Sequence, residues 1–162
     1  AQARAREPEA RLSVIGHGPL RRALQREAEQ LGIADAVNFL GALPSEGVRA
    51  AMFEAAVLLC PSVETERGDR ESGVLVLKEA AATGLATVGT RHGGIPEIIE
   101  HGQTGYLVPE RDVRALADAL IELLGSHALR ARLGGAARAK MEREYDARRQ
   151  NAALEQLLLS TL

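Results

Sequence analysis

Residues 57–97 read VLLCPSVETERGDRESGVLVLKEAAATGLATVGTRHGGIPE, and this stretch decides the predicted fold. Its pattern predicts a buried strand, a polar loop, an apolar helix and a second strand, at residues 57–61, 62–70, 72–83 and 86–90. Gly84 is the expected stop signal of the helix. A strand, a helix and a second strand in this order are typical of a parallel βαβ unit.

The rest of the chain continues the alternation of strands and helices. Further strands are predicted at residues 11–16, 36–41 and 106–108. Further helices are predicted at residues 20–31, 44–55 and 112–124, and from residue 126 to the end with a break near residues 145 and 146. Asp112 and Ser126 are expected to cap the last two of these helices. The alternation predicts an α/β fold with a parallel sheet and helices on both faces.

In such a sheet, ligands bind beyond the carboxyl ends of the strands. The loops that follow the strands are therefore expected to line the binding edge, after residues 16, 41, 61, 90 and 108.

Composition excludes several classes of function. The chain has 162 residues, enough for one domain with a core, and only 2% of them are aromatic, which does not suit stacking on single-stranded nucleic acid. The net charge of -2, without a long basic run, argues against a nucleic-acid surface. Cys60 lies in an apolar strand pattern and is expected to be a small buried hydrophobe. No membrane span or signal peptide is visible, so a cytoplasmic location is expected, and the first residue, Ala1, suggests a piece of a longer protein.

Gly16, His17 and Gly18 lie between a predicted strand and a predicted helix. A dinucleotide fingerprint needs a third glycine where this chain has Arg21, and an acidic residue at the end of the next strand, whereas Asp35 precedes that strand. The sequence therefore argues against a nicotinamide cofactor. The glycines still allow the backbone to approach a ligand closely, and His17 by itself is equally compatible with an ordinary loop residue.

Glu71 and Glu79 flank the start of the central predicted helix. Eight residues of helix separate two side chains by about 12 Å along the axis and roughly 80° around it, which does not suit a glycosidase pair facing one bond. The spacing suits an anion at the helix start with a hydroxyl-binding carboxylate on each side, as a nucleotide sugar requires. On the spacing alone, a capped helix with a chance second glutamate is the favoured explanation.

The motifs together resemble the carboxyl half of family 4 retaining glycosyltransferases of the GT-B fold. The resemblance covers roughly residues 11–125 and rests on the E-x7-E pair, on GGIPE in register with it, and on HGQTGYLV, LSVIGHGPL and VNFLGALP. The loop ETERGDRE is similar to the variant found in bacterial exopolysaccharide enzymes. The expected fold is thus a Rossmann-like parallel sheet, with a residual helix end at residues 1–10, a nucleotide-sugar-binding domain at 11–146 and a C-terminal helix at 147–162.

The resemblance implies a donor site for a UDP- or GDP-linked sugar, with no metal and no other cofactor in the transfer itself. Glu71 would contact the hydroxyls of the transferred sugar and act as the catalytic residue, and Glu79 would bind the ribose. Backbone N–H groups between Gly73 and Leu75 would bind the diphosphate, and the turn at Leu40 and Gly41 would face the base. The remaining donor-binding residues are expected to be Gly16, Leu40, Gly41, Ser72, Gly73, Val74 and Leu75.

The sequence departs from the family pattern in three ways. Ser72-Gly73-Val74 follows the first glutamate where Ser-Phe-Gly or Gly-Leu-Pro is frequent, and Lys78 occupies a position that is usually apolar. For Lys78 a solvent-facing position is favoured over a phosphate ligand, and Arg70 is only a weak candidate for contact with a phosphate or an acceptor. The largest departure is that the glycine-rich first strand, with its Arg and Lys clamp, and the amino-terminal acceptor domain are missing. In the strand order 3-2-1-4-5-6 the missing strand is the central one.

The sequence therefore predicts a sheet with a gap in its middle, which another segment or subunit fills, or an open edge through which copies of the chain associate. The enzyme of origin is expected to make a polysaccharide or glycolipid, and its peripheral association with a membrane is compatible with the resemblance. Two alternatives remain open, a GT-B-fold sugar-nucleotide epimerase and a non-catalytic α/β association module.

Overall fold

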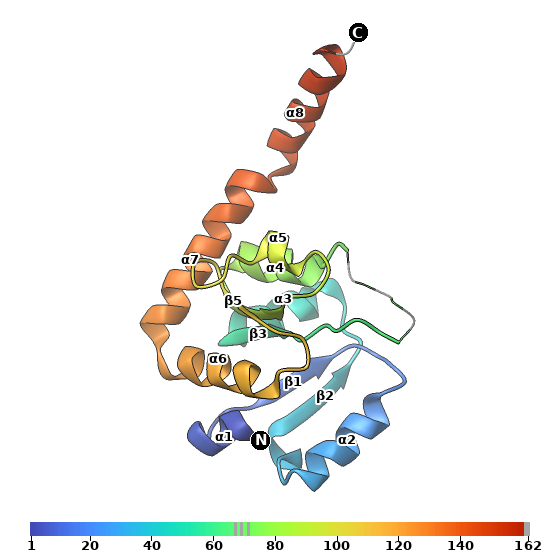
Figure 1. Cartoon of the computed structure of the whole chain (residues 1–162), viewed down its shortest axis with the longest axis vertical. Coiled ribbons are helices and arrows are strands. Elements are labelled where there is room, and N and C mark those ends of the chain that lie inside the picture. Colours follow the sequence, from blue (N-terminus) through green and yellow to red (C-terminus); the bar gives the residue numbers. More distant parts are fainter. Residues whose placement is uncertain (67, 69, 71, 161–162) are drawn as a thin grey trace.

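The computed structural model describes residues 1–66, 68, 70 and 72–160 (Figure 1). The first half of the fold contains α1 (Gln2–Arg6), β1 (Leu12–Ile15), α2 (Arg21–Gln30), the short 3-10 helix η1 (Ala34–Ala36), β2 (Val37–Gly41), α3 (Ser45–Glu54) and β3 (Val57–Cys60). The second half contains α4 (Leu75–Thr83), β4 (Ala86–Thr90), α5 (Ile95–Ile98), β5 (Tyr106–Val108), α6 (Val113–Gly125), α7 (His127–Glu144) and α8 (Ala147–Ser160). The predicted alternation of strands and helices is confirmed.

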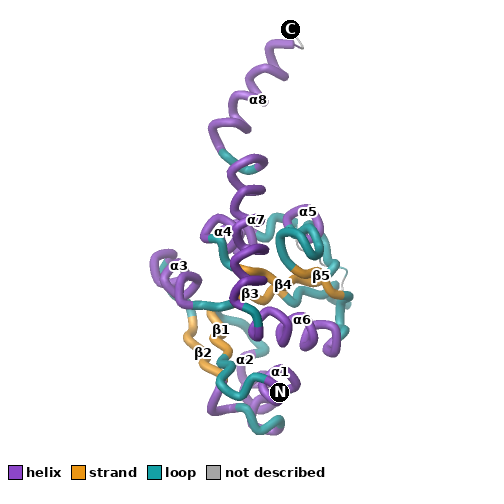
Figure 2. The backbone as a smooth tube through the Cα atoms, turned by 90° about the vertical axis from the view of Figure 1, so that its left-hand side faces the viewer, coloured by secondary structure: helices purple, strands orange, loops and turns teal. Residues whose placement is uncertain are grey.

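The described strands form two parallel sheets rather than one. β1 pairs with β2, and β3, β4 and β5 form a second sheet in that order. Figure 2 shows the two sheets as separate groups of strands. The break lies between β1 and β3, which is where the predicted strand order places the absent central strand. The predicted fold class, with a gap at the centre of the sheet, is confirmed.

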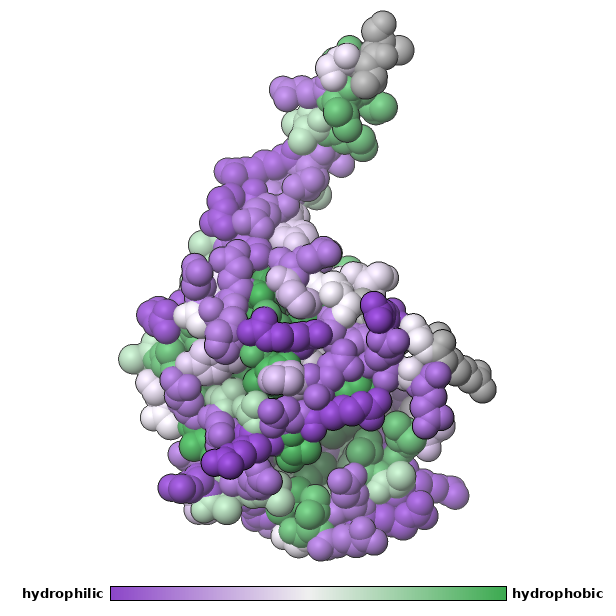
Figure 3. Space-filling model, viewed as in Figure 1, coloured by the Kyte–Doolittle hydropathy of each residue, from purple (hydrophilic) through white to green (hydrophobic). Residues whose placement is uncertain are grey.

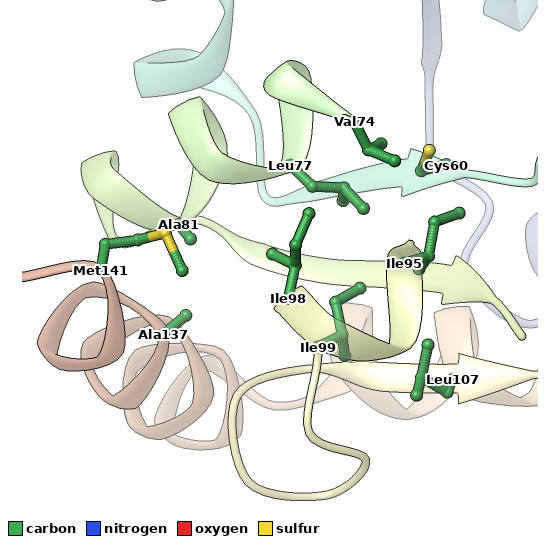
Figure 4. Close-up of a cluster of buried hydrophobic side chains, with 10 residues drawn as sticks. All are labelled: Cys60, Val74, Leu77, Ala81, Ile95, Ile98, Ile99, Leu107, Ala137 and Met141. Atoms are coloured by element: carbon green, nitrogen blue, oxygen red, sulfur yellow. The ribbon is translucent and has the colours of Figure 1, made fainter. Parts of the chain in front are cut away.

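Helices cover both faces of the three-stranded sheet, so that every residue of β4 is buried. On one face, α4, α5 and α7 enclose a cluster of apolar side chains (Figure 4), which consists of Cys60, Val74, Leu77, Ala81, Ile95, Ile98, Ile99, Leu107, Ala137 and Met141. On the other face, α6 and the start of α7 cover a second cluster around Val88, Leu123 and Leu133. Cys60 is buried among these apolar side chains, as predicted.

The two-stranded sheet is less well covered. Figure 3 shows apolar side chains on the surface in the lower part of the molecule, in the region of β1, β2 and α2. Leu12, Leu24 and Leu31 are exposed there, with relative exposures of 41%, 43% and 51%. The side of the fold next to the break therefore leaves apolar surface in contact with water, which soluble proteins usually cover.

α4 begins three residues later than predicted, at Leu75 instead of residue 72. The physical reason is the backbone of Val74, which lies at φ 25° and ψ 57° and so cannot continue a right-handed helix. The predicted end of the helix is confirmed, because Gly84 adopts the left-handed conformation at φ 78°. The predicted caps are also confirmed: the side chains of Asp112 and Ser126 accept hydrogen bonds from the N–H groups of residues 115 and 129 at 2.9 and 3.2 Å.

α7 packs against α4 along an apolar face, on which Leu133, Ala137 and Met141 are buried. The prediction for Lys78 was wrong, because this side chain is half-buried and its ammonium lies 4.8 Å from the centre of the Tyr145 ring. α8 extends away from the rest of the molecule (Figure 1), and none of its residues is buried. Within the described ranges, no helix combines the length and the apolar character needed to cross a bilayer.

Candidate functional site

The start of α4 lies where the chain returns from the carboxyl end of β3. Ser72 and Gly73 are exposed, the side chain of Val74 is buried at 7% relative exposure, and Leu75 is 70% exposed. The first backbone N–H groups of a helix have no intrahelical partner, and the helix dipole adds a partial positive charge to them. The exposed peptide groups at this position can therefore bind an anion.

Val74 is held in a conformation that β-branched residues rarely adopt, with φ at 25°. Its side chain is anchored in the apolar cluster beside Leu77 and Ile95. Burial of the side chain thus fixes the backbone at the helix start, and the strain is located at the point where the site is expected.

Gly94, the second glycine of the GGIPE motif, packs directly against this segment. A Cβ atom at position 94 would lie 2.5 Å from the carbonyl oxygen of Ser72, closer than real Cβ atoms approach oxygen. The backbone of Gly94 has φ -80° and ψ 0°, which any residue adopts, so a glycine is needed for space and not for its conformation. The loop after β4 therefore supports the backbone that enters α4.

Glu79 lies one turn into α4 and is exposed. Among the residues that the structure describes, its side chain makes no hydrogen bond or ion pair, so the carboxylate is available to a ligand. The predicted catalytic residue, Glu71, lies outside the described residues.

A second group of predicted site residues lies at the carboxyl ends of β1 and β2. The N–H of Gly16 donates to the carbonyl of Gly41 at 2.7 Å, and both glycines have positive φ angles, 121° and 74°. Leu40 beside them is 47% exposed. The structure thus brings Gly16, Leu40 and Gly41 together at one edge, and Ser72, Gly73, Val74 and Leu75 at the start of α4.

Two side chains that were not predicted as donor-binding residues, those of His17 and Arg21, lie over Gly41. Nε2 of His17 accepts a hydrogen bond from the N–H of Ala42 at 3.4 Å. The guanidinium of Arg21 donates to the carbonyl of Phe39 at 2.9 Å, and its central carbon lies 5.8 Å from the centre of the Phe39 ring. A Cβ atom at Gly41 would lie 3.3 Å from the His17 ring, so these side chains occupy the space above the glycine. For His17, two positions after the end of β1, the place after a strand was the available signal.

Polar side chains also connect the three loops beyond β3, β4 and β5. The buried ring of His92 lies with Nδ1 2.8 Å from Oε1 of Glu110, whose Oε2 accepts a hydrogen bond from the N–H of Glu64 at 2.9 Å. The hydrogen bond from that N–H and the interaction with His92 hold the pKa of Glu110 below its usual range. Arg70, the weak candidate for a phosphate contact, instead pairs with the side chain of Glu64 at 2.7 Å.

The sequence did not single out His92 and Glu110 as functional residues. Each is a polar residue two positions beyond the end of a strand, at the edge where ligands bind in this class of fold. That position was the signal that could have found them.

Residues 1–126 match the model of the family described as "Glycosyl transferases group 1". The chain belongs to this family. One relative, the amylovoran biosynthesis glycosyltransferase AmsK of Erwinia amylovora, is 38% identical over 145 residues, which are 90% of this chain and 35% of the relative. Another is the GDP-mannose-dependent alpha-(1-6)-phosphatidylinositol monomannoside mannosyltransferase of Mycolicibacterium smegmatis, 35% identical over 96% of this chain and 41% of the relative.

Among solved structures, Alr3699/HepE of Anabaena in complex with UDP superposes with a TM-score of 0.84 at 20% identity, over 98% of this chain and 44% of that one. This likeness shows the fold, which is the carboxyl-terminal half of a GT-B glycosyltransferase. The chain thus spans between one third and one half of the length of these three proteins. In its described part, no cluster of three or more His, Cys, Asp or Glu side chains is arranged to hold a metal ion.

Proposed function

We propose that this chain is the donor-binding half of a retaining glycosyltransferase that takes a hexosyl unit from a nucleoside-diphosphate sugar. The observation that carries the proposal is the start of α4, where exposed peptide groups at Ser72 and Gly73 are supported by Gly94 and flanked by the unpaired carboxylate of Glu79. Such a site accommodates an anion next to hydroxyl groups, which is the chemistry of a nucleotide sugar.

The diphosphate is proposed to bind the backbone N–H groups from Gly73 to Leu75, near the positive end of the α4 dipole. Negative charge builds up on the diphosphate as the bond to the sugar breaks. Fixed N–H donors and the helix dipole stabilise that charge without having to reorganise, so this is the main catalytic contribution of the site. Glu79 would bind the ribose hydroxyls and Glu71 the hydroxyls of the transferred sugar.

The base is proposed to lie at the other group of site residues, beside Leu40 and Gly41. The positive φ angle of Gly41 and the hydrogen bond between Gly16 and Gly41 leave backbone exposed at the end of two strands. UDP and GDP are the candidates: one structural neighbour is described in complex with UDP, and one relative is GDP-mannose-dependent.

A segment outside these 162 residues is proposed to supply the missing central strand, between β1 and β3, and the acceptor-binding domain. Support comes from the break in the sheet at this position and from relatives that are more than twice as long as the matched region. The product would be a polysaccharide or a glycolipid, and the enzyme would act in the cytoplasm, with peripheral attachment to a membrane as part of the same proposal.

Calorimetric titration of the chain with UDP, GDP and ADP tests the donor site. We expect one nucleotide to bind, and the Glu79→Ala variant to bind it about tenfold more weakly, because charge-assisted hydrogen bonds contribute about 1.5–3 kcal/mol. Glu155→Ala in α8 is the matched control, since Glu155 is also exposed on a helix but lies far along the projecting α8. Equal affinities of the wild type and Glu79→Ala would contradict the assigned role of Glu79.

The same titration separates the alternatives. An epimerase would also bind the nucleotide, but would change or release the sugar of a nucleotide sugar in the absence of any acceptor, which chromatography of the products detects. An association module would bind no nucleotide and would dimerise through β1 or β3, which sedimentation velocity detects. Restoring the family's first strand at the amino terminus of the chain and repeating the titration tests whether that strand completes the site.

A further inference from the structure

One short loop after β4, residues 91–94, contacts Ser72 directly and Glu64 through the side chain of Glu110. At the Ser72 end, the contact is the close approach of Gly94 to the Ser72 carbonyl. At the Glu64 end, the contact runs through the carboxylate of Glu110, which lies between the ring of His92 and the N–H of Glu64.

We propose that His92, Glu110 and Arg111 form a brace that positions the backbone entering α4 for donor binding, and that they are positioning residues for the transfer reaction. This proposal deepens the proposed donor site and rests on it. The brace is defined by these three residues, by the hydrogen bonds that join Glu110 and Arg111 to Glu64, and by the contact of His92 with Glu110.

The brace holds the peptide groups on both sides of Glu64. Its N–H donates to Oε2 of Glu110 at 2.9 Å, and its carbonyl accepts from the guanidinium of Arg111 at 3.0 Å. Glu110 and Arg111, which follow β5, thus bind the N–H and the carbonyl of Glu64, as a neighbouring β-strand would. Arg111 adopts a left-handed backbone with φ 62°, which is uncommon for a residue with a side chain.

His92 anchors the brace in the protein interior. Its side chain is 2% exposed, that of Glu110 is 28% exposed and that of Glu64 is 41% exposed, so the interactions run from the interior to the surface. The ring of His92 therefore lies where it holds the carboxylate of Glu110, and the proposal assigns it this role. Its buried interaction with Glu110 restrains a carboxylate that would otherwise be free to turn in water.

The brace is connected to the donor site by Gly94, two residues after His92 in the same loop. A shift of this loop therefore moves the Ser72 carbonyl, and with it the peptide groups that are proposed to bind the diphosphate. Sub-ångström placement of such groups matters, because donors stabilise a developing charge only when they are aimed at it beforehand.

The test combines amide NMR spectroscopy with nucleotide titration. Glu110→Ala removes both bonds of the carboxylate, and Arg111→Gly removes the guanidinium while relieving the left-handed backbone, so the second variant is expected to be no less stable than the wild type. Arg114→Ala is the control, because it removes a positive charge three residues further on, from a side chain that is 90% exposed.

We expect both brace variants to shift the amide resonances of residues 72–76 and Glu110→Ala to raise the exchange rate of the Glu64 N–H about tenfold. Both should weaken nucleotide binding about fivefold to tenfold, and Arg114→Ala should do neither. Glu110→Ala separates the brace from general electrostatics, because loss of a negative charge by itself would strengthen the binding of an anion.

Unchanged amide resonances at residues 72–76 in both brace variants would overturn the proposal, as would wild-type affinity in both. A wild-type chain that binds none of the nucleotides, while the amide shifts occur as expected, would refute the proposed donor site and leave the brace itself established. The two failures are therefore distinguishable.

Discussion

Gly134 lies in the middle of α7, at the point where this helix crosses the end of α4. A Cβ atom at position 134 would lie 1.9 Å from the carbonyl oxygen of Gly84, and 2.8 Å from its carbonyl carbon. Gly135, the next residue, has no atom within 4 Å of the corresponding position. The two neighbouring glycines therefore offer the same substitution with opposite expected results.

The magnitude follows from the geometry. To reach an approach of 3.0 Å, the tightest that real Cβ atoms show, α7 or the Gly84 turn has to move by about 1.1 Å. Overpacking of this kind costs typically 1–3 kcal/mol and occasionally more, because the side chains around it are close-packed. Here the movement would open the contacts of Leu133 and Ala137, which are 0% and 3% exposed.

Alanine also favours a helix interior over glycine by about 1 kcal/mol, which acts at both positions. The clash is with backbone, so the upper end of the overpacking range, about 3 kcal/mol, applies, and we expect Gly134→Ala to lower the free energy of unfolding by about 2 kcal/mol net. Gly135→Ala should raise it by up to about 1 kcal/mol. For a chain of this length, these changes correspond to a melting temperature roughly 4–8 °C lower and about 2–4 °C higher.

Thermal unfolding followed by circular dichroism, with urea unfolding to obtain the free energies, measures both variants. Equal stabilisation by the two substitutions would show that α7 does not approach Gly84 closely and would refute the packing argument. An intermediate result, with Gly134→Ala near wild type, would mean that the Gly84 turn yields at little cost.

Three further predictions follow from the same structure. Gly94→Ala should displace the Ser72 carbonyl and weaken nucleotide binding about tenfold, which calorimetry measures. The melting temperature should change little, since the backbone conformation of Gly94 suits alanine, and thermal unfolding measures this. Unaltered affinity would contradict the support that Gly94 gives to Ser72. Removing a helix cap by Asp112→Ala or Ser126→Ala should cost about 1 kcal/mol each, measured by urea unfolding, whereas Asp112→Asn should retain most of the stability. The pKa of Glu110 is lowered in the folded protein, so its contribution to stability is complete above the unfolded pKa of about 4.3 and is lost as the pH falls through the folded pKa. The melting temperature of Glu110→Gln should therefore fall less steeply than that of the wild type below about pH 4.5. Parallel curves of melting temperature against pH for the two proteins would argue against the hydrogen bond to Glu64.

Much of the fold was predictable because its signals are local. Apolar periodicity, glycine stops and side-chain caps depend on residues a few positions apart, and the caps at Asp112 and Ser126 formed as expected. The start of α4 was misplaced because burial of the Val74 side chain overrides the helical pattern of its neighbours. Of the candidate site, the sequence identified Glu79 and the glycine-rich segments, through the spacing of its motifs.

The tertiary structure decided the contacts between residues far apart in the chain. The brace joins Glu64 to Glu110 across 46 positions, and Lys78 contacts Tyr145 in a different helix; neither pair has a local signal. Parallel strands bring their following loops to one edge of the sheet, so these contacts depend on the order of the strands. The sequence by itself thus determined the elements, the parallel α/β class and the family resemblance, because these follow from short-range patterns. Only the folded chain decided that the buried ring of His92 meets Glu110 and that α7 needs a glycine where it crosses α4, because backbone approach and side-chain burial are properties of the packed molecule.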